Sequence, residues 1–214
     1  REKKIVKEIR NNLPKQINFA YQKNISYSQI SMFNQCPYKW RLHYKDKISQ
    51  RDTSIYLVFG IAIHEVMQEY LTVFYEQSKV KANEIDLNSK FQERFTDAYK
   101  MQYKQNNNLH FSSAEEMREF FEDGVAILNF FKKRISQYFS KRNTYLVGIE
   151  LPIINTPNKM LNNILFKGML DVVLYNEVLD EFTIIDIKTS TRGWHSKMTK
   201  DEQKQFQLIL YKQY

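Results

Sequence analysis

The sequence is poor in cysteine, glycine and proline, and each shortage excludes a class of protein. Cys36 is the single cysteine, so no disulfide and no cysteine-built zinc or iron–sulfur site can form within this chain. A free thiol fits a reducing cytosol, and we expect a cytoplasmic protein. With only 5 glycines and 4 prolines, the chain does not fit an all-β sandwich, which needs many turns.

Long apolar runs are also lacking. No uninterrupted stretch approaches the roughly 20 apolar residues that a membrane-spanning helix needs, so we expect no membrane partner. The opening residues, Arg1-Glu-Lys-Lys, lack the apolar segment of a signal peptide. Because the initiator Met is absent, we expect a trimmed or partial chain.

The residues that are present favour a well-packed, basic domain. Hydrophobic residues make up 43% of the chain, which is enough for a sizeable core, and we expect one domain over residues 1–214. The net charge of +8 attracts polyanions such as nucleic acid. A basic protein without such a partner has the same composition, so the charge alone leaves both interpretations open.

The first two thirds of the sequence have the apolar spacing of helices. Residues 1–25 form a basic, loosely amphipathic arm. Helical periodicity predicts a helix from Gly60 to Tyr75, a second around Phe91–Tyr99 and a third from Met117 to Phe139. We expect these three helices to form a helical lobe over residues 60–140.

After residue 140 the period changes to that of strands. Tyr145–Ile154, Leu165–Tyr175 and Glu181–Lys188 are rich in β-forming residues and are separated by turn-like segments. A helix follows from about Asp201 to the end. The sequence therefore predicts an α/β fold in which residues 145–214 supply the sheet and its last helix.

Three charged residues interrupt the predicted strands. Asp171 lies within the second strand, and Asp186 and Lys188 lie near the end of the third. Strand side chains alternate faces, so Asp186 and Lys188 share a face, and an antiparallel neighbour brings Asp171 beside them. Two close carboxylates repel one another, and a divalent cation relieves that repulsion. A buried Asp–Lys ion pair at a strand end explains the pattern equally well.

Five short motifs occur in a fixed order along residues 26–211. They are Ser26-Tyr-Ser-Gln-Ile-Ser-Met-Phe-Asn-Gln-Cys-Pro37, Phe59-Gly-Ile-Ala-Ile-His64, Gly168-Met-Leu-Asp171, Asp186-Ile-Lys188-Thr189 and Gln207-Leu-Ile-Leu-Tyr211. The ordered set resembles the PD-(D/E)XK nuclease superfamily and, within it, the RecB-like exonuclease branch. The resemblance implies a restriction-endonuclease-like fold, with a mixed central sheet flanked by helices and the helical lobe placed before the sheet.

The resemblance also implies roles for the charged residues. Asp171 and Asp186 would bind the metal ion together with the backbone carbonyl of Ile187. Lys188 would orient or help to deprotonate the attacking water and stabilise charge on the phosphate. His64 would be the additional metal ligand of the RecB-like branch, although a lone histidine on an apolar helix is often a core residue.

The last helix and the choice of metal follow from the same resemblance. Gln207 and Tyr211, one helical turn apart, would face DNA or the catalytic lysine. Oxygen-dominated ligands indicate Mg²⁺ or Mn²⁺, and a histidine ligand shifts the preference toward Mn²⁺.

Two further candidates have an ordinary structural explanation beside the functional one. Glu150 lies on the first predicted strand. It would face the metal site, assist in positioning DNA, or form an ion pair at the edge of the strand. Arg192, Trp194 and Lys197 combine cations with an aromatic ring, which suits phosphate contacts and base stacking, but a solvated loop with a tucked tryptophan is equally consistent.

Cys36-Pro37 resembles the first cysteine of iron–sulfur relatives, which include CRISPR-adaptation nucleases and AddB-type nuclease domains. Those proteins need three more cysteines after the last helix, and this chain ends at Tyr214. We therefore expect no iron–sulfur cluster in this chain. A natural protein that continued past Tyr214 would reopen the question.

The function expected from these patterns is that of a metal-dependent deoxyribonuclease. The resemblance implies an exonuclease or flap-type enzyme that acts on single strands or DNA ends in recombination, repair or replication, with a helicase or recombination partner. A sequence-specific restriction-type endonuclease is the first alternative, and His64 would then have no role. A catalytically silent nucleic-acid-binding module is the second, and the intact Asp171, Asp186 and Lys188 argue against it.

Overall fold

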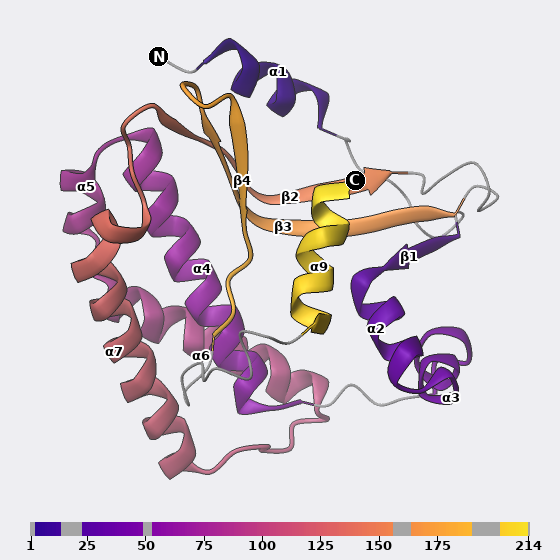
Figure 1. Ribbon diagram of the computed structural model, residues 1–214. Coiled ribbons are helices and arrows are strands. Elements are labelled where there is room, and N and C mark those ends of the chain that lie inside the picture. The colour runs from indigo at the N-terminus through magenta and orange to yellow at the C-terminus, as the bar shows by residue number, and fades with distance from the viewer. Residues whose placement is uncertain (1–2, 14–22, 49–52, 156–163, 190–201, 214) are drawn as a thin grey trace.

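The computed structural model describes residues 3–13, 23–48, 53–155, 164–189 and 202–213. A bent sheet lies at the centre, with a helical lobe packed on one face and the first and last helices on the other (Figure 1). The expected α/β architecture, a mixed sheet flanked by helices with a helical lobe before it, is confirmed.

The lobe consists of four helices. They are α4 (Ile55–Glu76), α5 (Lys79–Glu84), α6 (Leu87–Gln105) and α7 (Ala114–Tyr138). Each begins after a serine or aspartate whose side chain accepts a hydrogen bond from a backbone N–H of the first turn. The first helix starts five residues before the expected Gly60, because Ser54 caps it by accepting from the N–H of Leu57 at 3.3 Å.

Aromatic side chains fill the core of the lobe. The ring of Phe59 lies edge-on to both Phe91 and Phe120, with ring centres 6.2 and 5.4 Å apart. Gly124 of α7 admits the Phe91 ring, since a Cβ atom there would lie only 2.2 Å from it. This packing holds α4 in place against α6 and α7.

By length and composition, α4 is apolar enough to cross a membrane, with a mean hydropathy of 1.2 over 18 residues. The sequence prediction concerned uninterrupted apolar runs, whereas this criterion averages hydropathy over a helix that also contains His64, Glu65 and Gln68, so it does not test the prediction. Half of that window (50%) is buried inside the protein, and the core helix of a soluble domain meets the same criterion. Val58, Ala62 and Ile63 are wholly buried in the lobe core.

Among the described residues, the sheet has four strands around a central β3. They are β1 (Asn24–Ser26), β2 (Thr144–Asn155), β3 (Leu165–Asn176) and β4 (Glu181–Ile185). One edge of β3 pairs antiparallel with β2. The other edge pairs parallel with β1 at Leu165–Lys167 and antiparallel with β4 at Val172–Asn176. Between them, Gly168–Asp171 has no strand on that side among the described residues.

The strands differ from expectation at two places. β1 was not predicted, because three residues are too few to show a period. β4 ends at Ile185 rather than at Lys188, so Asp186 and Lys188 lie just beyond the regular strand. Both still follow directly from β4, and their placement depends on its pairing with β3.

Side chains on β3 change face at Asp171. Phe166 and Leu170 belong to the core beneath α1 and α9, whereas Val172 and Leu174 belong to the core of the lobe. All four would share one face of a regular strand. On the neighbouring strand, Glu150 has a φ angle of +49°. Both strands therefore depart from regular geometry at one level, where they bend in Figure 1.

The described residues form five further helical segments. They are α1 (Lys4–Asn12), α2 (Tyr27–Gln35), α3 (Pro37–Trp40), a π-helical turn (Arg41–Lys45) and α9 (Glu202–Gln213). Val6 of α1 is 1% exposed and belongs to the core that lies beneath α1 and α9. Arg10 donates to the carbonyl oxygens of Leu146 and Val147 at 3.0 and 2.8 Å, where β2 has a register shift. α1 is thus docked against the irregular part of β2.

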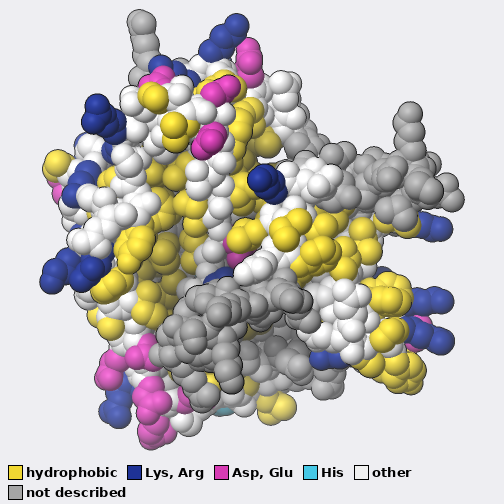
Figure 2. Space-filling model, in the orientation of Figure 1, with side chains coloured by type: hydrophobic (Ala, Val, Ile, Leu, Met, Phe, Trp, Pro, Cys, Tyr) yellow, Lys and Arg dark blue, Asp and Glu magenta, His cyan; other side chains and the backbone are white. Residues whose placement is uncertain are grey.

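The last helix packs on the sheet through one buried side chain. Tyr211 is 8% exposed, and a Cβ atom at Gly168 of β3 would lie 2.7 Å from its ring. The glycine lets α9 approach the part of β3 that is paired with β2 on one edge and has no described strand on the other. Phe206 and Leu208 of α9 remain 40% and 42% exposed, and hydrophobic side chains gather on the visible surface over this part of the molecule (Figure 2).

Candidate metal centre and active site

The strand register places Glu150 and Asp186 on either side of Asp171. On β2, the residues before and after Glu150 pair with those on either side of Asp171. On the other edge, the antiparallel pairing of β4 with β3 ends at Ile185 and Val172, so Asp186 follows level with Asp171. Three carboxylates from three consecutive strands or strand ends therefore meet at the bend of the sheet.

Helix α4 adds an imidazole to this group. Nδ1 of His64 lies 3.8 Å from Oδ2 of Asp171. His64, Glu150 and Asp171 each present one potential ligand atom, and these atoms all lie within 4.8 Å of one another. One imidazole with two carboxylates is a donor set that suits Mn²⁺ or Mg²⁺. The described residues therefore fit a divalent cation at this point.

A glutamine one turn along α4 holds the third ligand. Gln68 donates from Nε2 to Oε1 of Glu150 at 2.6 Å and is only 7% exposed. Sequence reasoning missed Gln68 and left Glu150 with three interpretations. A polar residue four positions after His64, on the buried face of an apolar helix, was the available signal.

The electrostatic environment of Asp171 also indicates a cation site. Burial raises the pKa of the Asp171 carboxyl, and the nearby charges of Asp186 and Glu150 raise it further. The N–H of Ile187, which donates to Oδ2 at 2.7 Å, and the charge of His64 lower it. The net result is a carboxylate whose negative charge is disfavoured without a bound cation.

Asp186 has different partners in the structure. Lys188 donates from Nζ to its two oxygens at 2.8 and 3.1 Å, and Gln207 of α9 donates from Nε2 to Oδ1 at 3.1 Å. The same amide also donates to the Tyr211 hydroxyl at 3.0 Å. Ile187 follows Asp186 in the sequence, and its N–H donates to the carboxylate of Asp171. It therefore lies between the two carboxylates. The structure thus joins the expected Asp186, Lys188, Gln207 and Tyr211 in one network.

The predicted residues are brought together with two qualifications. The group of ligand atoms within 4.8 Å of one another consists of His64, Glu150 and Asp171, and the oxygens of Asp186 are hydrogen-bonded to Lys188 and Gln207. Arg192, Trp194 and Lys197 lie outside the described residues, so their predicted DNA contacts stay predictions.

The raised pKa of Asp171 predicts a stability effect. The charged form of Asp171 destabilises the folded protein. This destabilisation is absent below the ordinary carboxyl pKa of 3.8, grows as the pH rises, and is complete above the pKa of the folded state. Asp171→Asn should therefore stabilise the metal-free protein at pH 7 by roughly 0.5–2 kcal/mol, as substitutions at strained functional sites often do. Urea unfolding in EDTA measures this difference.

A matched control for that experiment is Asp97→Asn, on the exposed side of α6. The gain from Asp171→Asn should shrink at pH 4, whereas Asp97→Asn should change little at either pH. A metal-free Asp171→Asn protein less stable than wild type at pH 7 would contradict the electrostatic account.

Comparison with known families assigns the chain. A family model described as the PD-(D/E)XK nuclease superfamily matches residues 24–214, which span all four strands and α9 and leave out α1. A search of curated proteins gives no match. The resemblance inferred from the ordered motifs is confirmed at the level of the superfamily, whose members are nucleases. This chain belongs to the PD-(D/E)XK nuclease superfamily.

Proposed function

We propose that this chain is a metal-dependent deoxyribonuclease that hydrolyses phosphodiester bonds beside Asp171 and Asp186. The observation that carries the proposal is the group of His64, Glu150 and Asp171, whose ligand atoms lie within 4.8 Å of one another. The ion pair between Asp186 and Lys188 lies just beyond the end of β4, level with Asp171. Neither a structural ion pair nor a core histidine explains why all five residues converge.

His64, Glu150, Asp171 and Asp186 would hold the metal ion. When bound, a divalent cation supplies an acidified water and neutralises charge that develops on the phosphate. With an imidazole among carboxylates, the site suits Mn²⁺ at least as well as Mg²⁺.

Lys188 is placed to act on the reacting groups. Its side chain is 39% exposed and that of Asp186 is 11% exposed, so the ammonium lies at the solvent side of the pair. From there it can orient a water molecule or donate to a phosphate oxygen. Gln207 keeps the Asp186 carboxylate in place through its hydrogen bond to Oδ1.

The finer assignment is to an exonuclease or flap-type enzyme of the RecB-like branch, acting on single strands or DNA ends. Its support is His64, because a restriction-type endonuclease gives this histidine no role, and here it lies beside Asp171. The net charge of +8 supports DNA as substrate. A cytoplasmic role in recombination, repair or replication, with a helicase partner, is part of the same proposal.

The proposal predicts metal-dependent cleavage that requires a DNA end. Purified protein should degrade end-labelled linear single strands with Mn²⁺ or Mg²⁺ and leave closed circular duplex intact, and EDTA should abolish activity because the carboxylates alone cannot activate water. Gel analysis of labelled products measures both effects.

Three results would count against it. Cleavage that survives EDTA undiminished would remove the mechanism. Cuts at defined positions in circular duplex would favour the restriction-type alternative, and binding without any cleavage would favour the silent module.

A further inference from the structure

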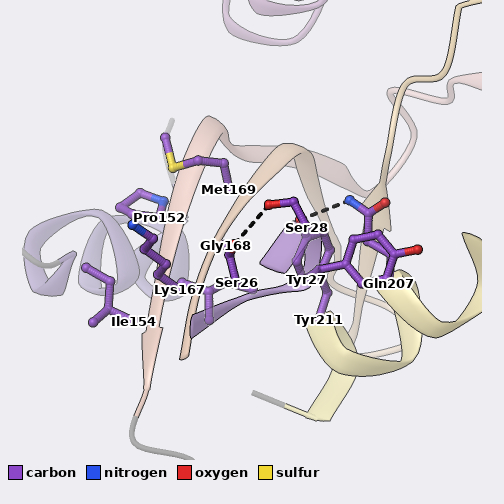
Figure 3. Close-up of a pocket in the computed structure, with 11 residues that line it drawn as sticks. Ser26, Tyr27, Ser28, Pro152, Ile154, Lys167, Gly168, Met169, Gln207 and Tyr211 are labelled. Carbon is purple, nitrogen blue, oxygen red and sulfur yellow. Dashed lines mark hydrogen bonds between the residues drawn. The ribbon is translucent and has the colours of Figure 1, made fainter. Parts of the chain in front are cut away.

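A pocket of about 450 Å³ opens next to the active site, between α9 and the start of α2. Its floor is the stretch of β3 that is paired with β2 on one edge and, among the described residues, has no strand on the other (Figure 3). Gln207 lines the pocket and also donates to Asp186, so one side chain separates the pocket from the catalytic carboxylate.

The lining combines an apolar surface with a few polar groups. Pro152, Ile154 and Met169 supply the apolar part, and Met169 is 48% exposed, so its side chain is open to an incoming group. Ser28 and Gln207 supply a hydroxyl and an amide on the other side (Figure 3). A flat group with apolar faces and hydrogen-bonding edges fits this arrangement.

Among the described residues, the lining of the pocket contains no carboxylate that would repel a nucleic acid. Its eleven residues, all in the described part of the chain, include Lys167 and no aspartate or glutamate. Tyr27, whose ring centre lies 6.4 Å from that of Phe206, adds an aromatic wall. A nucleotide has the required features: a flat base with polar edges, attached to a phosphate that a lysine can neutralise.

We propose that this pocket receives the unstacked base of a nucleotide next to the scissile phosphate. In a duplex, both faces of a base are stacked and its edge is paired, so a base can enter a pocket only when it is unpaired or turned out of the stack. The pocket therefore makes the enzyme require a single strand at the cut. This inference rests on the proposed nuclease function and adds the substrate feature that the metal site alone does not specify.

The pocket can be filled without disturbing the core. Ser28 is exposed in the first turn of α2, and its hydroxyl lies 2.9 Å from that of Ser26. Ser28→Trp should occupy the space of the base, whereas Asn34→Trp places the same ring on the exposed side of the same helix, away from the pocket. Both variants should bind Mn²⁺ like wild type, because neither residue belongs to the ligand group.

Ser28→Trp should lower kcat/KM on a single-stranded oligonucleotide by roughly tenfold to a hundredfold, the range for losing one base-stacking site. Asn34→Trp should stay within about twofold of wild type. Equal rates for the two variants, with wild type active, would overturn the pocket inference and leave the nuclease function standing. No cleavage by wild type in Mn²⁺ would overturn the proposed function and this inference with it.

A second measurement needs no variant. Oligonucleotides that carry one abasic position at successive distances from a defined cut should show slower cleavage by wild type at one or two positions next to the cut. An abasic position leaves the backbone charge intact, so phosphate binding is preserved and only the base contact is lost. Equal rates at all positions would overturn the inference.

Discussion

Replacing Lys188 with alanine is expected to lower the cleavage rate by roughly 10²–10⁴-fold, the range for removing a residue that transfers a proton or stabilises developing charge. Asp186→Ala should have an effect at least as large, because it removes both a carboxylate and the partner of Lys188. DNA binding should change little, since phosphate contacts spread over a basic surface carry most of the affinity. Single-turnover rates at saturating Mn²⁺ and fluorescence anisotropy in EDTA measure the two quantities.

Lys212→Ala is the matched control, because it removes an exposed lysine from α9 without touching the Asp186 network. Its cleavage rate should stay near that of wild type. If Lys188→Ala also turned over at nearly the wild-type rate, Asp186 and Lys188 would be a structural ion pair and nothing more.

His64→Ala is expected to weaken Mn²⁺ binding by at least roughly tenfold to a hundredfold. Mutating a residue that only supports a metal ligand typically costs this much, and losing a ligand itself should cost no less. The reason is geometric: Nδ1 of His64 lies 3.8 Å from Asp171 and completes a group that the carboxylates leave open. Affinity should also fall on acidification, because an imidazole binds metal only when deprotonated. Calorimetric Mn²⁺ titration of wild type and variant measures the change.

His43→Ala serves as the control, since His43 lies in the π-helical turn and outside the ligand group. The melting temperature of metal-free His64→Ala should change little, because the side chain is 26% exposed and fills no core position. Equal Mn²⁺ affinities with intact cleavage would return His64 to the status of a packing residue and remove the support for the RecB-like assignment.

Local pattern was sufficient to predict most of the secondary structure. Apolar periodicity identified α4, α6 and α7, because each helix buries one face in the lobe core. β-forming residues marked β2 and β3, although β3 is buried on both faces from Val172 to Tyr175. Helix starts were predicted less well: α4 begins at Ile55, after its cap Ser54, since a capping hydrogen bond depends on one side chain rather than on a repeat.

The pairing of Asp186 with Lys188 was also predictable from the sequence. Two residues separated by one position on an extended segment share a face wherever the segment lies. The contact therefore persists at 2.8 Å although β4 ends before Asp186. Asp171 lies beside them because a short turn between β3 and β4 enforces antiparallel pairing.

The remaining parts of the site are decided only by tertiary structure. His64 lies about a hundred residues before Asp171, and the two meet because α4 packs across the bend of the sheet. Glu150, with a φ angle of +49°, joins the ligand group because β2 pairs with β3 at the level of Asp171. The pocket beside Gln207 is lined by residues of β1, α2, β2, β3 and α9. Periodicity describes what one segment buries, whereas these distances depend on how distant segments pack, and no local pattern records that.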